Sequence, residues 1–196
     1  MNAIQTDAET LTRLHARLES DAARDSLLDV TYRTIDTPLG TLLLASTERG
    51  LVRVAYAIEN HDRVLDTLAT KVSPRILRSP RRLDDTAREL DEYFAGARTS
   101  FDLPLDFTLS HGFRRSVLDH LPQIEFGHTE SYAQVAQAAG SPRAVRAVGT
   151  ACATNPLPLV VPCHRVVRSD GSYGQYAGGA EAKRMLLQME ASRLAA

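Results

Sequence analysis

The chain has 196 residues, of which 43% are hydrophobic, and its formal net charge is −1. This length allows one large domain or two small ones, and the apolar content is sufficient for a packed core. The two cysteines, Cys152 and Cys163, are too few for a disulfide framework or a four-cysteine zinc site, so we expect a reducing compartment and no metal. The N-terminus lacks the pattern of a signal sequence, and no apolar run approaches the ~20 residues that span a membrane, which predicts a cytoplasmic protein.

The charge is unevenly distributed along the chain. Residues 131–196 contain seven basic and three acidic residues, a net charge of +4, which leaves −5 for residues 1–130. A basic C-terminal part favours an anion-binding face, although ordinary scatter of charge explains the same numbers equally well.

The first half of the chain alternates between helical and strand-like patterns. Leucines recur at helical spacing over 8–28, with Leu11, Leu14 and Leu18 on one face. Two apolar runs joined by a short loop that contains Gly50 predict a β-hairpin. The predicted strands are 41–46 and 51–57, the helices that follow are 62–71 and 83–94, and an extended segment, 101–107, is the best place for a domain boundary.

A helix-turn-helix pattern follows in the second half. Ser131, with Gln134 three residues later, predicts a capping box for the first helix of the pair, and Gly140 fits its end. Ser141 and Pro142 then fit the cap and first turn of the second helix. Further helices are predicted from residue 112 and over 181–194.

The second helix of this pair has two different faces. The inward face combines Val145, Val148, Gly149 and Cys152, so we expect Cys152 in the core. The outward face carries two arginines with small residues between them, which can approach a phosphate backbone or a groove closely. Its residues are Arg143, Arg146, Ala147 and Thr150. A solvated surface helix accounts for this face equally well.

The motif Pro162-Cys163-His164-Arg165 is the strongest candidate for chemistry. A cysteine is nucleophilic as the thiolate, which needs a base or a positive field nearby, and His164 stands next to Cys163. Neighbouring side chains of an extended segment point to opposite faces, so a bridging water is the expected link between thiol and imidazole. The alternative is a buried cysteine beside a surface histidine.

Two polar residues are candidate partners for this motif. Asn155 precedes a proline in a turn, and its side chain can hydrogen-bond backbone and hold a neighbouring loop. Glu190 lies close to the apolar stripe of the last helix, where a carboxylate needs a partner and can orient an imidazole. An exposed ion pair with Arg193 is the alternative for Glu190.

A glycine-rich segment, 171–179, contains Tyr173 and Tyr176. It is too irregular for a dinucleotide-binding fingerprint, but it can wall a pocket in which an aromatic side chain stacks on a base. Tyr132, which opens a predicted helix, can present its hydroxyl to the same pocket. A surface loop and a core tyrosine are the respective alternatives.

Together these motifs resemble the O6-alkylguanine-DNA alkyltransferases, also called methylated-DNA–protein-cysteine methyltransferases. The resemblance runs from about residue 30 to the C-terminus and leaves residues 1–28 outside. It is carried by motifs in the family's order and spacing, namely Ser131-Tyr132, Arg143 to Gly149, Asn155-Pro156, Pro162-Cys163-His164-Arg165-Val166 and Tyr176-Ala177-Gly178-Gly179.

The resemblance implies an α/β (α+β) fold. Residues 29–107 then form a ribonuclease H-like domain with a small antiparallel sheet and helices. Residues 1–28 lie outside the resemblance, and the leucine spacing predicts that they are an N-terminal helical extension. Residues 108–196 form a mostly helical domain that contains the helix-turn-helix, binds DNA and accepts the alkyl group.

The same resemblance implies direct-reversal DNA repair. The alkyl group of O6-alkylguanine, and also that of O4-alkylthymine, is transferred irreversibly to Cys163 after the base is flipped out from the minor groove. Each molecule acts once, as a monomer on double-stranded DNA, with cooperative binding along DNA left open. No cofactor is implied, because the alkylated base is itself the donor.

The family's roles carry over to matching positions of this chain. His164 is then the base that takes the thiol proton through a water, Glu190 orients His164, Asn155 braces the turn, and Tyr132 donates its hydroxyl proton to the leaving guanine. Arg146 is the finger that fills the space of the flipped base. The remaining substrate- and DNA-binding positions are Arg143, Ala147, Thr150, Val166, Tyr176, Ala177, Gly178 and Lys183, with backbone N–H groups of Ala177 and Gly178 near O6 and the carbonyls of Cys163 and Val166 on the exocyclic amine.

Four residues depart from the family's usual ones, namely Met185, Ala177 and the pair Glu125-Phe126. Two other classes of protein stay open on the sequence. One is a binding protein, either a helix-turn-helix regulator or an alkyltransferase-like lesion sensor, although such sensors lack the acceptor cysteine. The other is a cysteine hydrolase, which would turn over and would not need the arginine-bearing helix.

Overall fold

The first part of the fold is a four-stranded sheet in a computed structural model that describes residues 8–24 and 27–194. The strand order is β3-β2-β1-β4. The strand β2 is antiparallel to both β1 and β3, and β4 is parallel to β1. The expected antiparallel sheet is therefore mixed, because the sequence pattern revealed the hairpin but not its outer neighbours. The strands are β1 (Val30–Thr37), β2 (Gly40–Thr47), β3 (Gly50–Tyr56) and β4 (Ile76–Arg78).

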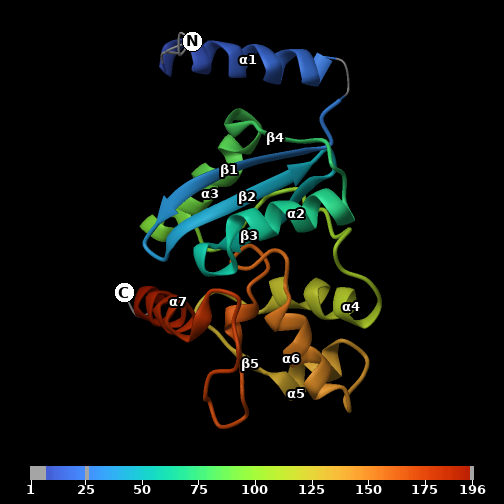
Figure 1. The fold of residues 1–196 in the computed structure, drawn as a ribbon. Helices are drawn as coiled ribbons and strands as arrows, with labels where there is room; N and C mark the ends of the chain where they lie inside the picture. The colour runs from blue at the N-terminus through green and yellow to red at the C-terminus, as the bar shows by residue number, and fades with distance from the viewer. Residues whose placement is uncertain (1–7, 25–26, 195–196) are drawn as a thin grey trace.

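Helices cover both faces of this sheet (Figure 1). In β2, Leu42 and Leu44 pack into the larger hydrophobic cluster, and Leu43 and Ala45 pack into the smaller one on the opposite face. The continuous apolar run of β2 thus reflects burial on both sides. The smaller cluster includes side chains of α2 (His61–Lys71), and the larger includes side chains of α3 (Asp84–Ala95). The bounds of both helices agree with the predicted ones to within one residue at each end. Short 3-10 turns precede them, η1 (Ala57–Glu59) and η2 (Pro80–Leu83).

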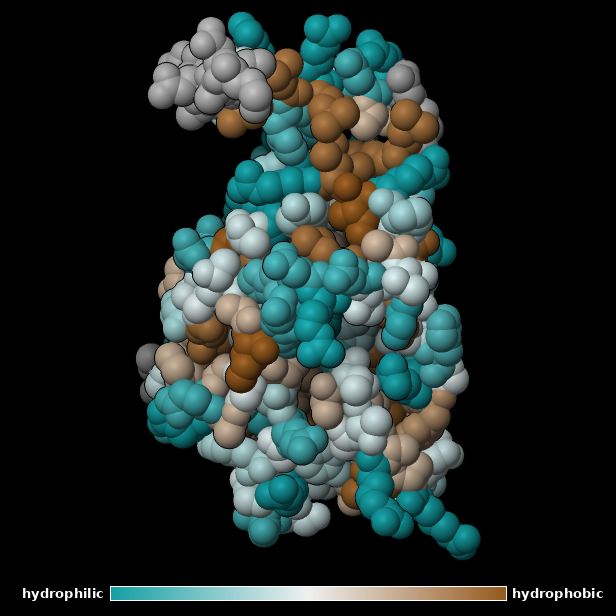
Figure 2. All heavy atoms as spheres, viewed as in Figure 1, coloured by the Kyte–Doolittle hydropathy of each residue, from teal (hydrophilic) through white to brown (hydrophobic). Residues whose placement is uncertain are grey.

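The first helix, α1 (Ala8–Arg24), lies across one end of the molecule (Figure 1). It ends four residues before the predicted boundary, and residues 25–26 of that prediction lie outside the described residues, as do residues 1–7. Its leucine stripe is half-exposed, with Leu11 56% accessible, and hydrophobic residues gather below α1 in Figure 2. Polar contacts attach the helix to the sheet edge, since His15 donates to the carbonyl of Arg78 at 2.6 Å and Glu19 accepts from Ser79.

The second part of the fold is mostly helical. Its helices are α4 (Gly112–His120), α5 (Tyr132–Ala138), α6 (Val145–Ala153) and α7 (Gly179–Leu194), with 3-10 turns η3 (Leu121–Gln123) and η4 (Cys163–Arg165), and the short strands β5 (Glu130–Ser131) and β6 (Val166–Val167) pair in parallel. Ser131 and Gln134 form the predicted capping box of α5, and Gly140 follows that helix with a left-handed φ of 77°. Among the helices of the described residues, none is both long and apolar enough to cross a bilayer.

The second helix of the predicted helix-turn-helix begins later than expected. Ala144 donates to the carbonyl of Ser141 at 2.8 Å, so residues 141–144 form a turn with Pro142 at its second position. The helix α6 therefore starts at Val145, and Ser141 caps no helix. Val145 was predicted on the inward face but is exposed. It is the first residue of α6, and the buried part of the helix begins only at Val148.

The two parts share one core. The larger hydrophobic cluster includes Leu44, Leu90, Val117 and Leu186, which come from both halves of the chain. The extended segment 101–107 runs along β3. The N–H of Leu51 donates to the carbonyl of Pro104, and a parallel bridge pairs Leu51 with Leu105. This pairing ties the connection between the two parts to the edge of the sheet.

Gly50 sits where that connection approaches most closely. Its φ is 136°, and a Cβ there would lie 2.1 Å from the carbonyl oxygen of Pro104. We expect Gly50→Ala to lower the free energy of unfolding by about 3 kcal/mol, because backbone strain and a backbone clash add together. Gly40→Ala is the matched control, since φ is 91° but the space is open, and it should cost about 1 kcal/mol in urea denaturation. Equal losses for the two variants would contradict the role of the close approach.

Candidate active site

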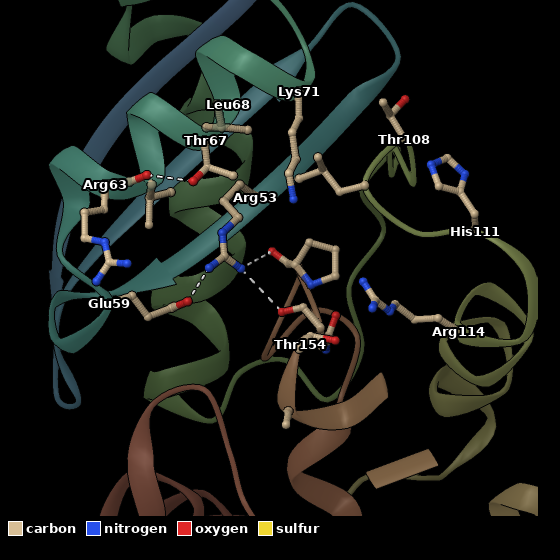
Figure 3. A pocket seen from close by; sticks show the side chains of 15 residues that line it. Arg53, Glu59, Arg63, Thr67, Leu68, Lys71, Thr108, His111, Arg114 and Thr154 are labelled. Atoms are coloured by element: carbon tan, nitrogen blue, oxygen red, sulfur yellow. Dashed lines mark hydrogen bonds and ion pairs between the residues drawn. The ribbon is translucent and has the colours of Figure 1, made fainter. Parts of the chain in front are cut away.

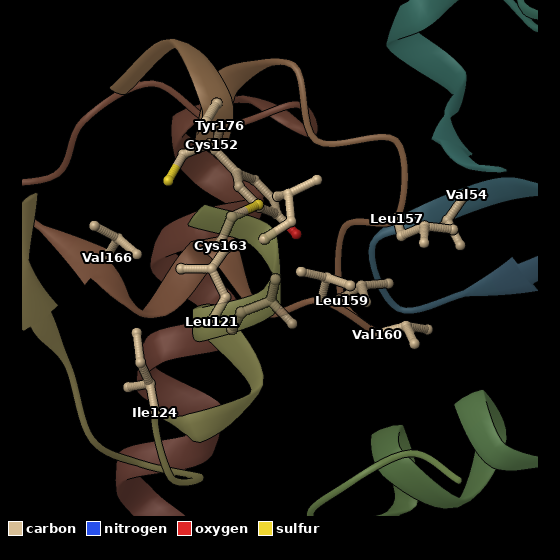
Figure 4. Close-up of a cluster of buried hydrophobic side chains, with 14 of the residues drawn as sticks. Val54, Leu121, Ile124, Cys152, Leu157, Leu159, Val160, Cys163, Val166 and Tyr176 are labelled. Carbon is tan, nitrogen blue, oxygen red and sulfur yellow. The ribbon is translucent and has the colours of Figure 1, made fainter. Parts of the chain in front are cut away.

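Cys163 lies at the start of the 3-10 turn η4 and is completely buried (Figure 4). The Asn155 side chain holds the turn, because its Nδ2 donates to Sγ of Cys163 at 3.1 Å and to the carbonyl of Val161 at 2.8 Å. Its Oδ1 accepts from the N–H of Leu157 at 2.9 Å. One amide thus fixes the loop that precedes the cysteine and also contacts the sulfur.

That loop contains a strained residue. Leu159 has φ 74°, a left-handed value that is uncommon for a residue with a side chain, and its side chain is buried. Such strain costs on the order of 1 kcal/mol or more and persists only where the surroundings impose it. The packing around Leu159 and the bonds of Asn155 supply that constraint.

The imidazole of His164 is directed toward α7. Its Nε2 lies 2.9 Å from Oε1 of Glu190, and both side chains are completely buried. The expectation of an extended segment at Cys163 and His164 is wrong, because η4 turns the chain tightly here. The alternative of a surface histidine is wrong as well.

Glu190 accepts hydrogen bonds from four directions. Besides His164, it accepts from the hydroxyl of Tyr93 at 2.6 Å, the N–H of Gly127 at 3.0 Å and two nitrogens of Arg165 at 2.9 Å. Burial by itself raises the pKa of Glu190, but the bonds from His164 and Arg165 outweigh it and hold the pKa far below the usual range. The exposed pair with Arg193 is wrong, since Arg193 donates to the carbonyls of Tyr93 and Phe94 instead.

The ionised carboxylate determines the tautomer of His164. A carboxylate only accepts, so Nε2 carries the proton and Nδ1 keeps its lone pair. Nδ1 is buried without a hydrogen-bond partner among the described residues. Burial lowers the pKa of His164 despite the opposing effect of Glu190, so the imidazole is neutral near pH 7. The site therefore contains a buried base, Nδ1 of His164, whose lone pair is free to accept a proton.

The thiol of Cys163 is protonated in this environment. Burial raises its pKa to about 11, although the bond from Asn155 and the charge of Lys183 favour the thiolate. Lys183 is completely buried, and its ammonium donates to the carbonyl of Val166 at 2.5 Å. The contact of Lys183 with a ligand would therefore be indirect, through that carbonyl.

A cavity of about 610 Å³ lies beside the glycine-rich segment, lined by Glu59, Ala153, Arg168, Tyr173, Gly174, Gln175, Tyr176, Ala177, Gly179 and Ala180. The hydroxyl of Tyr176 bonds that of Tyr56 at 2.8 Å. Gly174 lies directly against the Tyr132 hydroxyl, because a Cβ there would be 2.0 Å from it. Gly178 packs in the same way on the ring of Tyr56. The glycine-rich segment therefore forms a wall of the cavity that includes Tyr173 and Tyr176, and it packs on Tyr132 and Tyr56.

The predicted outward residues Arg146, Ala147 and Thr150 are exposed on α6, and Arg143 is exposed in the turn that precedes this helix. Cys152 lies on the inward face and is buried, which confirms its place in the core (Figure 4).

Sequence reasoning missed four contributors to the site, namely Tyr56, Tyr93, Gly127 and Arg165. Arg165 stands in the cysteine motif, and its burial beside an acidic residue was open to inference. The other three come from distant segments, and no local pattern marks them.

Two family models match the chain. One, described as the 6-O-methylguanine DNA methyltransferase ribonuclease-like domain, matches residues 30–107, and the other, the DNA binding domain of the same group, matches residues 112–192. A methylated-DNA–protein-cysteine methyltransferase of Methanosarcina barkeri is 36% identical over 83% of this chain and 98% of its own length. The constitutive one of Bacillus subtilis is 39% identical over 81% of this chain and 94% of its own length. The structure of Mycobacterium tuberculosis OGT in complex with DNA aligns with a TM-score of 0.72 and 36% identity, covering 83% of this chain and 94% of that one.

Glu190→Gln should destabilise the fold strongly. The variant leaves the buried guanidinium of Arg165 without its counter-charge, so we expect the free energy of unfolding to fall by about 3–5 kcal/mol. Because the folded-state pKa of Glu190 is lowered, its stabilisation is complete above its ordinary value of 4.5 and is lost as the pH falls below it. The wild type should therefore lose stability below pH 4.5 more steeply than the variant.

The control is Glu181→Gln on the same helix, whose carboxylate is exposed and pairs with Arg184. Denaturant titration should show a nearly unchanged stability for this variant. A Glu190→Gln protein as stable as the Glu181→Gln protein would contradict a central role for the buried carboxylate.

Proposed function

Because the chain belongs to the 6-O-methylguanine DNA methyltransferase family, we propose that Cys163 accepts the alkyl group that this protein removes from O6-alkylguanine in DNA. The protein is a methylated-DNA–protein-cysteine methyltransferase that repairs alkylated DNA. The observation that carries the proposal is the Asn155–Cys163 contact beside a buried histidine with a free ring nitrogen. Cys152 has no comparable partner among the described residues.

The buried base supplies the activation step. The thiol proton of Cys163 passes through a water to Nδ1 of His164, whose other nitrogen is held by Glu190. The resulting imidazolium is stabilised by the carboxylate, as in other relays of nucleophile, base and acid. Asn155 keeps the sulfur and its loop in place, which limits the reorganisation that the reaction requires.

Transfer then occurs in one displacement. The sulfur forms a bond to the alkyl carbon while the bond from that carbon to O6 breaks, and the electron pair goes to the guanine. Burial raises the pKa of Tyr132 to about 12, so its hydroxyl is protonated and can donate to the departing base. The proton on His164 afterwards restores the tyrosine hydroxyl. The alkylated base is the donor, so the reaction needs no cofactor.

The 610 Å³ cavity is the proposed guanine site. Tyr176 lines it, and the backbone N–H groups of Ala177 and Gly178 face O6. These two residues lie just before the N-terminus of α7, where the helix dipole favours negative charge. The carbonyls of Cys163 and Val166 accept from the exocyclic amine, and Lys183 orients the second of them. O4-alkylthymine presents a similar alkylated oxygen and is a second substrate in this proposal.

The DNA lies along the outward face of α6, in the minor groove. O6 of guanine is enclosed in the duplex, so the base must be rotated out, at a cost of a few kcal/mol. Arg146 fills the vacated space, and Arg143, Ala147 and Thr150 approach the backbone. We assign these contacts to residues 108–196 and a supporting role to 29–107. The protein acts as a monomer.

The reaction ends with the first transfer. A thioether has no hydrolytic exit, so the Cys163 adduct is permanent and the protein is consumed in proportion to the lesions. A cysteine hydrolase would instead regenerate its thiol.

Mass spectrometry of the intact protein and its peptides tests the acceptor. After incubation with a duplex that contains O6-methylguanine, we expect one added methyl group on the Cys163 peptide. Cys163→Ala should abolish the adduct and still bind DNA, and Cys152→Ala, which removes the other buried thiol, should retain it. Methylation of the Cys163→Ala protein would refute the assignment, and tight binding without any adduct in the wild type would indicate a lesion sensor.

Arg146→Ala separates base flipping from chemistry. We expect the rate of repair in duplex DNA to fall about 10–100-fold, since the flipped state loses a stabilising contact of a few kcal/mol. The rate with free O6-alkylguanine base should stay at the wild-type value. Arg88→Ala, which removes an exposed arginine from α3, is the control and should alter neither rate. Equal slowing of both reactions by Arg146→Ala would exclude the finger role.

A further inference from the structure

A second and larger cavity lies outside the proposed guanine site. Its volume is about 950 Å³, and it is bounded by α2, by the segment that leads into α4, and by the C-terminal end of α6 (Figure 3). Arg63 and Lys71 come from α2, Arg114 comes from α4, and Thr154 lies between them at the base of the opening. The first and second parts of the fold thus each contribute one wall.

Three cations of this cavity have no partner. Within residues 8–24 and 27–194, neither an ion pair nor a side-chain hydrogen bond engages Arg63, Lys71 or Arg114. The carboxylate that lines the cavity, Glu59, is already paired with Arg53. Arg114 is only partly exposed, so its unpaired charge is directed into a confined space. We call the cavity into which these three side chains project the cationic cleft.

The other arginines near the site are engaged differently. Arg53 donates to the carbonyls of Asn155 and Pro156, and Arg165 is held by Glu190. Their charges are used within the protein. Unpaired charges that converge on one opening carry an electrostatic cost that an anionic ligand would relieve.

The cationic cleft continues the proposed DNA surface. Ala147 and Thr150 on α6 are followed at helical spacing by Thr154, which caps the C-terminal end of the helix and lines the cleft. Glu59 and Ala153 line both the cleft and the guanine cavity, so the two openings are contiguous. A strand that lies along α6 therefore reaches the cleft at the C-terminal end of that helix.

We propose that the cationic cleft binds the phosphate backbone of the DNA duplex, beyond the helix-turn-helix. Arg63 and Lys71 would then give residues 29–107 a direct part in DNA binding. The inference rests on the proposed placement of DNA along α6, but it does not require alkyl transfer. Lysine and arginine contacts to phosphate carry no sequence information, which suits a protein that must scan any sequence.

The test is the salt dependence of binding to an undamaged duplex. The double variant Lys71→Gln/Arg114→Gln should reduce the slope of log affinity against log salt concentration by about 2, because each lost phosphate contact removes about 0.9. At ~0.1 M salt this corresponds to a loss of affinity of roughly 50-fold. Arg81→Gln/Arg82→Gln removes the same charge from η2, whose arginines do not line the cleft, and should leave the slope nearly unchanged.

Two further measurements keep the outcomes distinct. The rate of alkyl transfer from free O6-alkylguanine base should equal that of the wild type in both double variants, which reports an intact fold. Lys71→Arg/Arg114→Lys keeps the charges and should keep the slope, and Arg63→Gln alone, on the exposed surface of α2, should lower it by about 1. Equal slopes for the cleft variants and the η2 control would overturn the proposal. Because undamaged DNA is used, failure of the alkyl-transfer proposal would appear separately, as a wild type that binds DNA but acquires no adduct.

Discussion

The structure depends on the ionised carboxylate of Glu190, which is buried completely. Removing a carboxylate from water is costly, so its position is tolerated only because donors surround it. Those donors come from α3, from the loop before β5 and from η4, and the carboxylate itself lies on α7. One charge thus joins the sheet-bearing part, the turn η4 and the last helix. The same charge fixes the tautomer of His164, so architecture and reactivity depend on one group.

Cys163 and His164 are both held in a state of low reactivity. Cys163 is buried with its thiol protonated, and the neighbouring base is neutral. Neither group is strongly reactive alone, and both are completely buried in the free protein. In the proposed reaction Cys163 is consumed, so low reactivity toward other electrophiles is an advantage, because each accidental adduct would remove one molecule. The tight loop around Leu159 and Asn155 fixes this arrangement in the free protein.

Local sequence patterns predicted the helices, the hairpin, the capping box of α5 and the burial of Cys152. These patterns did not predict the elements whose position depends on contacts between distant segments of the chain. The strand β4 is three residues long and is defined by its pairing with β1, so no local periodicity reveals it. The start of α6 is set by a turn bond from Ala144 to Ser141, which competes with helix capping at the same residues. The 3-10 turn at Cys163 depends on the bonds of Asn155 and Glu190.

The site residues show the same division. Cys163, His164 and Asn155 are close in the sequence, and their motif revealed them. Tyr93 and Gly127 became visible only in three dimensions, because each contributes a single donor from an otherwise ordinary segment.

The position of Glu190 in the last helix also has a consequence for synthesis. Chains emerge from the ribosome N-terminus first, and their parts fold as they appear. The sheet, α3 and even Cys163 are therefore made before the residue that organises them. Until α7 is complete, His164 lacks its carboxylate and Arg165 lacks its counter-charge. The buried ion network around Glu190 can therefore form only at the final stage of translation.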